Sequence, residues 1–212
     1  MYKTVVFDLD GTLLNTLTDL ADAGNRLCRK YGWPTHERQA YRYFVGNGIP
    51  KLVERLAPAD QRTPAVLEAA LADFKRDYGQ HLRDTTAPYP GIPEMLAKLK
   101  ANGVQLAVFS NKADALAKEV VKDYFGTQYF TIVRGQMTGV APKPAAEGTN
   151  ALLQALHADP ASTLYVGDSN VDVETAHNAN LPCCGAVWGF RTREELNAAG
   201  NNCKITVGGT VK

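Results

Sequence analysis

The sequence predicts an α/β protein in which a parallel sheet is interrupted by an inserted block of helices. Three observations lead to this prediction. Residues 4–9 form a β-branched apolar run typical of a buried strand. Residues 16–87 carry helical patterning without a convincing pair of strands. After a turn at 87–93, strands and helices alternate, which is typical of a parallel sheet covered by helices.

The helical block is expected to form a domain of its own. Helix breakers divide it near Pro34, residues 46–50, Pro58 and Pro64. We therefore expect an α/β core domain made of residues 1–15 and 88–212, with residues 16–87 inserted as a helical domain.

The second half shows the alternation in detail. From Ile92, apolar residues recur at i, i+3, i+4 and i+7, which predicts a helix that ends at Asn102 and Gly103. A buried strand follows over 104–109. The later elements are a strand over 163–168, a helix over 171–179 and a strand that begins within 182–190.

Composition excludes several classes of function. The 212 residues are 45% hydrophobic, and 23 Lys and Arg face 22 Asp and Glu without a block of like charge. Neither a nucleic-acid partner nor a membrane surface is expected. No apolar run approaches the roughly 18 residues of a membrane span, so we expect a cytoplasmic protein. The four cysteines lack metal-ligand spacing and are expected to be reduced.

Polar residues follow each strong strand. Since parallel strands end at one edge of the sheet, their polar residues can converge there. A lysine between two prolines, Lys143, precedes a further helix. The other candidates, in chain order, are Asp8, Asp10, Ser110, Asn111, Lys112, Asp168, Ser169 and Asp172.

These residue types favour phosphoryl chemistry with a divalent cation. Asp8 and Asp10 point to one side of their strand, so their carboxylates repel unless one is protonated or a cation binds. Oxygen ligands with a substrate phosphate suit Mg²⁺. One aspartate could attack phosphorus to form an aspartyl-phosphate, while the second protonates the leaving oxygen and later activates water. Gly11 would permit a tight turn that brings backbone N–H groups to the phosphate.

Four motifs in this order, DLDGT, FSNK, APKP and GDSNVD, resemble those of the haloacid dehalogenase superfamily. The resemblance covers the whole chain. It implies a Rossmann-like parallel sheet with helices on both faces, an α-helical cap domain and a magnesium-dependent phosphatase. The stretches VGNGIPKLVERL and YPGIPEMLAKLKANG resemble the phosphoglycolate phosphatase group, which makes 2-phosphoglycolate the best single substrate prediction.

The resemblance also implies roles for individual residues. Asp8 would be the nucleophile and a metal ligand, and Asp10 the general acid and base with its backbone carbonyl on the metal. Asp168 would ligate magnesium. The phosphate would be bound by Ser110, Asn111 and Lys143. Supporting positions are Gly11, Thr12, Ser169 and Asp172, although Asp172 could instead be a charge favourable to a helix N-terminus.

The sequence departs from the family pattern at two places. Asn15 stands where many relatives carry an aspartate at the hinge into the cap, and PKPAAEG lacks the second acidic residue usual in PKPDP. In the cap, Asn47 and Lys51 of GNGIPK could contact substrate or could mark a helix boundary before Pro50.

Two alternatives share this core. A phosphomutase of the β-phosphoglucomutase type would return the phosphoryl group to another hydroxyl of a sugar phosphate. A non-catalytic phosphometabolite-binding protein would keep the fold without turnover. The expected partner is a small phosphate ester, and the chain is expected to act as a monomer or homodimer.

Overall fold

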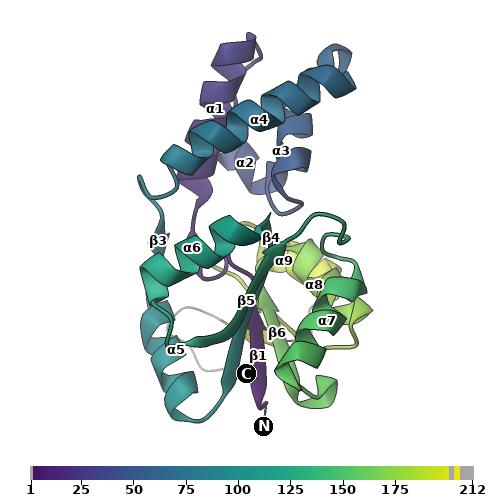
Figure 1. The fold of residues 1–212 in the computed structure, drawn as a ribbon. Helices are drawn as coiled ribbons and strands as arrows, with labels where there is room; N and C mark the ends of the chain where they lie inside the picture. Colours follow the sequence, from purple (N-terminus) through teal and green to yellow (C-terminus); the bar gives the residue numbers. More distant parts are fainter. Residues whose placement is uncertain (1, 201–202, 206–212) are drawn as a thin grey trace. The chain divides into compact units, whose positions relative to one another are not determined.

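The computed structural model describes residues 2–200 and 203–205, and these form two compact units (Figure 1). One unit combines Met1–Asn15 with Pro88–Lys212, and the other is Thr16–Ala87. A two-stranded sheet of β2 (Leu14–Asn15) and β3 (Ala87–Pro88) occurs where the chain passes between the units.

The first unit is built on a six-stranded parallel sheet in the order β5-β4-β1-β6-β7-β8. The strands are β1 (Thr4–Phe7), β4 (Gln105–Ala113), β5 (Phe130–Gln136), β6 (Thr163–Gly167), β7 (Cys183–Ala186) and β8 (Cys203–Ile205). In the register of the central strands, Val6 lies opposite Ala107 on β4 and Tyr165 on β6. The three strands that carry the predicted site are therefore neighbours, with their carboxyl ends at one edge.

Helices cover both faces of this sheet, which confirms the predicted fold class. Figure 1 shows α5 and α6 on one face and α7 and α8 on the other. The helices of this unit are α5 (Ile92–Ala101), α6 (Asp114–Phe125), α7 (Ala146–Leu156), η2 (Pro160–Ser162), α8 (Asn170–Asn178) and α9 (Arg193–Ala198). Helix α5 has the bounds that its apolar spacing predicts. Strand β4 is longer than predicted, because the polar residues 110–112 continue it.

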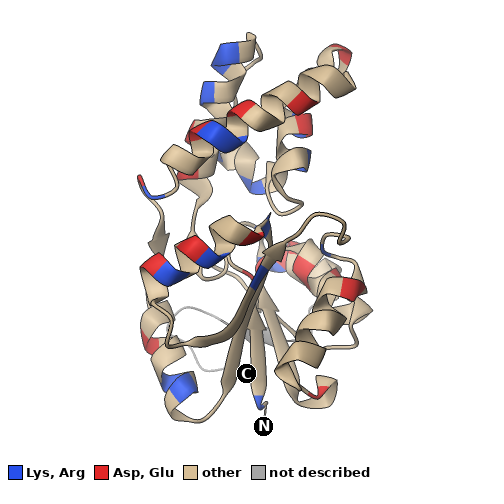
Figure 2. Ribbon diagram, viewed as in Figure 1, with Lys and Arg blue, Asp and Glu red and all other residues tan. Residues whose placement is uncertain are grey.

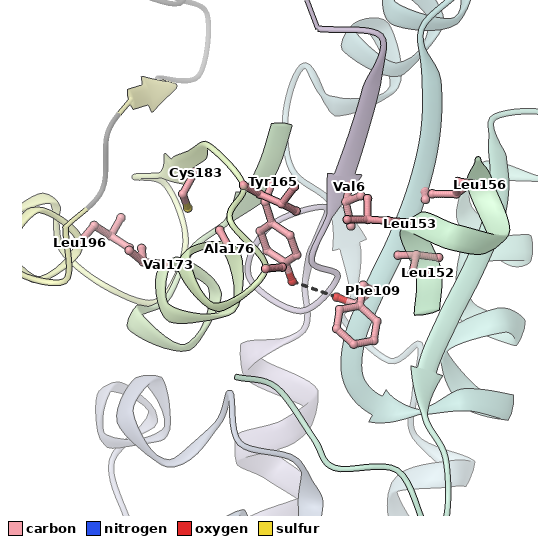
Figure 3. Packing of buried hydrophobic residues seen from close by; sticks show 13 residues of the cluster. Val6, Phe109, Leu152, Leu153, Leu156, Tyr165, Val173, Ala176, Cys183 and Leu196 are labelled. Carbon is pink, nitrogen blue, oxygen red and sulfur yellow. Dashed lines mark hydrogen bonds between the residues drawn. The ribbon is translucent and has the colours of Figure 1, made fainter. Parts of the chain in front are cut away.

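The face covered by α7 and α8 holds a continuous apolar core (Figure 3). Val6, Phe109 and Tyr165 reach it from three strands, and α7 contributes Leu152 and Leu156. All four residues of β1 are buried, as expected of a strand covered on both faces. The hydroxyl of Tyr165 lies 3.4 Å from the carbonyl oxygen of Phe109, so this core extends to the polar edge of the sheet.

The regular secondary structure of the second unit is helical, apart from its last residue. Its helices are α1 (Leu17–Tyr31), α2 (Arg38–Phe44), α3 (Ile49–Leu56), η1 (Ala59–Gln61) and α4 (Pro64–Gln80). Pro64 opens α4, and the hydroxyl of Thr63 accepts a hydrogen bond from the Val66 N–H. Fully buried Tyr41, Phe74 and other aromatic side chains fill the interior. Figure 2 shows both signs of charge interspersed along α4 and α6.

A buried carboxylate ties the two ends of this unit together. Asp19, in the first turn of α1, accepts hydrogen bonds from the backbone N–H groups of Thr85 and Thr86, each at 2.9 Å. It also accepts from their two hydroxyl groups, at 2.5 and 2.7 Å. Four donors on one carboxylate satisfy the acceptor sites of both of its oxygens. We call this arrangement the Asp19 clasp.

Two further expectations concern cysteines and membranes. Cys28 and Cys183 are free and buried, but Cys184 is disulfide-bonded, so the expectation of four reduced cysteines is wrong for that residue. The side chain of Cys203 lies outside the described residues. Among the helices that the structure describes, none combines the length and the apolar character needed to cross a bilayer.

Candidate active site

Three carboxylates gather at the carboxyl edge of the sheet. Asp8 follows β1, Asp168 follows β6, and Asp172 lies in the first turn of α8. One oxygen from each lies within 4.8 Å of the others, and all three residues are buried. The oxygen-only donors favour a hard cation such as Mg²⁺ over zinc, which prefers nitrogen and sulfur ligands. These three residues therefore fit a magnesium site, and we call them the acidic cluster.

Lys143 supplies the positive charge that the acidic cluster needs. Its Nζ lies 2.8 Å from Oδ1 of Asp8 and 2.7 Å from Oδ1 of Asp172. It also contacts the carbonyl oxygen of Phe109 and the hydroxyl of Tyr165, both at 3.2 Å. Burial by itself would lower the pKa of the Lys143 ammonium, yet the carboxylates of Asp172 and Asp8 hold that pKa well above its usual range. The lysine therefore remains charged in the interior.

Crowding and burial change the acidity of the cluster itself. Burial raises the pKa of Asp8 to about 7, against the opposing attraction of Lys143. Burial, together with the charges of Asp172 and Asp8, also holds the pKa of Asp168 well above its usual range. Without a metal, burial therefore favours the protonated forms of Asp8 and Asp168, and a bound cation must displace any proton that they hold.

Asp168 is held by two hydrogen bonds and lies close to two glycines. The hydroxyl of Thr12 donates to its Oδ1 at 3.1 Å, and the backbone N–H of Phe190 donates to its Oδ2 at 2.7 Å. A Cβ atom on Gly11, whose φ is +91°, would lie 2.3 Å from Oδ2, and one on Gly189 would lie 2.2 Å from the Asp168 Cβ. Both glycines are therefore needed for the close approach of this carboxylate.

The turn expected at Gly11 is present, with a hydrogen bond inside it. The Gly11 N–H donates to the carbonyl oxygen of Leu14 at 2.8 Å. The structure thus gives Gly11 a second use that the sequence did not indicate, which is to leave room for Asp168.

Asp172 makes contacts both at the charged site and at a helix N-terminus, the two roles considered for its position. Its Oδ1 accepts from Lys143, whereas its Oδ2 accepts from the N–H of Ser169 at 3.1 Å and from the Ser169 hydroxyl at 2.7 Å. One oxygen therefore belongs to the charged site and the other to the N-terminus of α8. Ser169 supports the cluster by orienting this carboxylate.

The side chain of Asn111 holds the loop that carries Lys143. The N–H of Lys143 donates to Oδ1 of Asn111 at 2.9 Å, and Nδ2 of Asn111 donates to the Lys143 carbonyl oxygen at 3.2 Å. The hydroxyl oxygen of Ser110 accepts from the Lys112 N–H at 3.2 Å, which leaves its own O–H able to donate. Ser110 can bind an anion directly, while both polar ends of the Asn111 amide contact the backbone of Lys143.

Sequence reasoning placed Lys112 at this edge but gave it neither a partner nor a role. Nζ of Lys112 lies 3.2 and 3.4 Å from the two carboxylate oxygens of Asp10. The motif FSNK contains Lys112, but spacing along the chain does not show which carboxylate a lysine reaches. The hydroxyl of Tyr165, which contacts Lys143, was missed because its position within an apolar strand predicts only core packing.

The two candidates in the helical unit make local contacts. Arg55 donates to Oδ1 of Asn47 at 2.9 Å, and Lys51 forms an exposed ion pair with Glu54 at 2.7 Å. Their predicted contact with substrate stays a prediction.

Comparison with known proteins agrees with this arrangement. The model of the haloacid dehalogenase-like hydrolase family matches residues 5–186. The phosphoglycolate phosphatase of Thiobacillus denitrificans is 31% identical over 191 residues, covering 89% of this chain and 84% of the relative. That of Neisseria meningitidis is 32% identical over 191 residues, covering 89% and 81%.

A solved structure extends the similarity to three dimensions. The crystal structure of a proposed phosphoglycolate phosphatase from Lactobacillus delbrueckii matches with a TM-score of 0.91 and 28% identity, covering 98% of this chain and 95% of the other. The fold, the ordered motifs and the sequence relatives agree. The chain therefore belongs to the haloacid dehalogenase-like hydrolase family, in its phosphoglycolate phosphatase-like group, and is a phosphoric monoester hydrolase.

Proposed function

We propose that this enzyme is a magnesium-dependent phosphatase that hydrolyses a small phosphorylated metabolite, with 2-phosphoglycolate the best single substrate. The observation that carries the proposal is the position of Asp8. Its carboxylate belongs to the acidic cluster and pairs with buried Lys143, which supports a role for Asp8 as a nucleophile beside a metal and a cation for phosphoryl oxygens. The similarity to enzymes named phosphoglycolate phosphatase supports the substrate.

The residues divide the chemistry as follows. Asp8 attacks phosphorus, and the bond from phosphorus to the leaving oxygen breaks as Asp10 gives that oxygen a proton. Asp10, now a carboxylate, takes a proton from the water that attacks the aspartyl-phosphate, which releases phosphate and restores Asp8. Lys143 and Ser110 bind the phosphoryl oxygens, and Asn111 positions Lys143 through its backbone.

Magnesium would be held by the carboxylates of Asp8 and Asp168 with the backbone carbonyl of Asp10, and Asp172 would support this set. When bound, the ion neutralises charge on the phosphoryl oxygens. Thr12 and Ser169 keep the carboxylates of Asp168 and Asp172 oriented through the hydrogen bonds described above. We expect the enzyme to act in the cytoplasm as a monomer or homodimer.

Phosphate release from a panel of small phosphoesters tests this proposal, with Mg²⁺ or with a chelator present. Release should be greatest on 2-phosphoglycolate, should require Mg²⁺, and should be lost in Asp8→Asn. Asp123→Asn, an exposed carboxylate on α6, serves as the matched control and should retain activity. Near-normal turnover by Asp8→Asn would contradict the mechanism. Isomerised sugar phosphate without free phosphate would identify a phosphomutase, and metal binding without either product would indicate a binding protein.

A further inference from the structure

Lys112 is a buried lysine that the mechanism above leaves without a role. Its side chain is only 2% exposed, and it lies near the carboxyl end of β4. Taking an ammonium group out of water is unfavourable unless hydrogen bonds and an opposite charge compensate. The carboxylate of Asp10, with both oxygens within 3.4 Å of Nζ, supplies that charge.

Each aspartate of the DLDGT motif forms an ion pair with a different lysine. Lys143 pairs with Asp8, whereas Lys112 pairs with Asp10. The acidic cluster accordingly contains Asp8 but not the side chain of Asp10. The two carboxylates differ in access as well, since that of Asp8 is 11% exposed and that of Asp10 is 20% exposed. Asp10 thus has its own counter-charge and the greater access to solvent.

Lys112 also contacts a phosphate-binding residue through its backbone. Its N–H donates to the hydroxyl oxygen of Ser110 at 3.2 Å while its side chain reaches Asp10. One residue of β4 therefore fixes the relative positions of a group proposed to bind the phosphoryl oxygens and a group proposed to protonate the leaving oxygen.

We propose that Lys112 is a positioning residue for Asp10, an inference that rests on the proposed phosphatase mechanism. Its ammonium group holds the Asp10 carboxyl group beside the leaving oxygen and apart from the acidic cluster. In the first step, the proton moves from Asp10 to the leaving oxygen as the phosphorus–oxygen bond breaks, and the carboxylate that remains is paired with Lys112. Lys112 keeps its own protons throughout and does not touch the substrate.

The test compares two leaving groups. An alkyl phosphate, the best of the panel above, releases a poor leaving group that needs a proton from Asp10. The aryl ester p-nitrophenyl phosphate releases a phenolate that departs without one. Because kcat/KM covers the steps up to departure of the leaving group, it isolates the acid step from later hydrolysis of the aspartyl-phosphate.

For Lys112→Met, we expect kcat/KM on the alkyl ester to fall at least about tenfold and on the aryl ester less than about threefold, since a well-placed general acid contributes about 10²–10⁴-fold. Asp10→Asn should show the same split, and Asp10→Asn combined with Lys112→Met should be no worse than Asp10→Asn alone. Lys112→Arg, which keeps the charge, should retain more alkyl activity than Lys112→Met. Lys100→Met, an exposed lysine on α5, should leave both values unchanged.

Equal losses on the two esters, or no loss on either, would overturn the positioning role and leave the proposed function intact. Should Lys112→Met fail to fold by circular dichroism, Lys112→Gln, which keeps a hydrogen-bond donor, is subject to the same comparison. A wild-type enzyme that hydrolyses neither ester would overturn the proposed function, and this inference with it.

Discussion

Replacing Gly11 with alanine should destabilise the fold and displace the carboxylate of Asp168. Two costs combine. The φ of +91° is unfavourable for alanine by about 1–2 kcal/mol. The new Cβ would also lie 2.3 Å from Oδ2 of Asp168. A free side chain would move aside at little cost, but Asp168 is held by hydrogen bonds from Thr12 and Phe190, each worth about 1 kcal/mol. We therefore expect a loss of about 3–4 kcal/mol in the free energy of unfolding.

Gly103→Ala separates these two costs. Gly103 also has a positive φ, +74°, but an added Cβ meets nothing within 4 Å. It should cost only the backbone strain of about 1–2 kcal/mol. Urea unfolding of the two variants and the wild type measures the difference, and a magnesium titration of phosphatase activity should show a higher Mg²⁺ requirement for Gly11→Ala alone. Equal destabilisation by both variants, with equal Mg²⁺ requirements, would refute the role assigned to Gly11.

Three further predictions follow from the contacts described above. Because the pKa of Asp8 is about 7 without metal, Mg²⁺ should raise the melting temperature less at pH 6 than at pH 8, and an equal rise at both would contradict the proton competition. Asn111→Ala should lower kcat about tenfold or more and cost about 2 kcal/mol in urea unfolding, since it frees the Lys143 loop and removes two buried hydrogen bonds; an unchanged kcat would exclude positioning. Asp19→Asn should cost about 2–3 kcal/mol in urea unfolding, whereas Asp22→Asn, exposed on the same helix, should cost almost nothing.

Local patterns were sufficient for the elements whose apolar residues follow a regular period. β1 and α5 carry continuous or helically spaced apolar residues, so their positions could be predicted. β5 was not predicted, because Phe130–Gln136 is only partly buried at the edge of the sheet and mixes polar with apolar residues. The polar ending of β4 concealed the true length of that strand, since residues 110–112 stay in the sheet to reach the site.

The sequence was enough to predict which residues form the site, but not which lysine pairs with which aspartate. Motif order brought Asp8, Lys143 and Asp168 to one edge, as expected. Which lysine pairs with which aspartate depends on β4 and β1 being neighbours in the sheet. The spacing of residues along the chain does not reveal this strand order. Asn111 illustrates the same limit, because an amide beside a phosphate site looks like a ligand until its backbone partners are known.

The Asp19 clasp bears on how a domain can be inserted into a sheet protein at all. A long insertion normally imposes a loop-closure cost on the host, because its two ends must be brought together. Here that closure is made inside the insert, by hydrogen bonds between the first turn of α1 and Thr85 and Thr86. The loop-closure cost to the α/β core is therefore that of a short connection, whatever the length of the inserted helices. We expect an insert with such self-joined ends to tolerate changes in its length while the catalytic edge of the sheet stays the same.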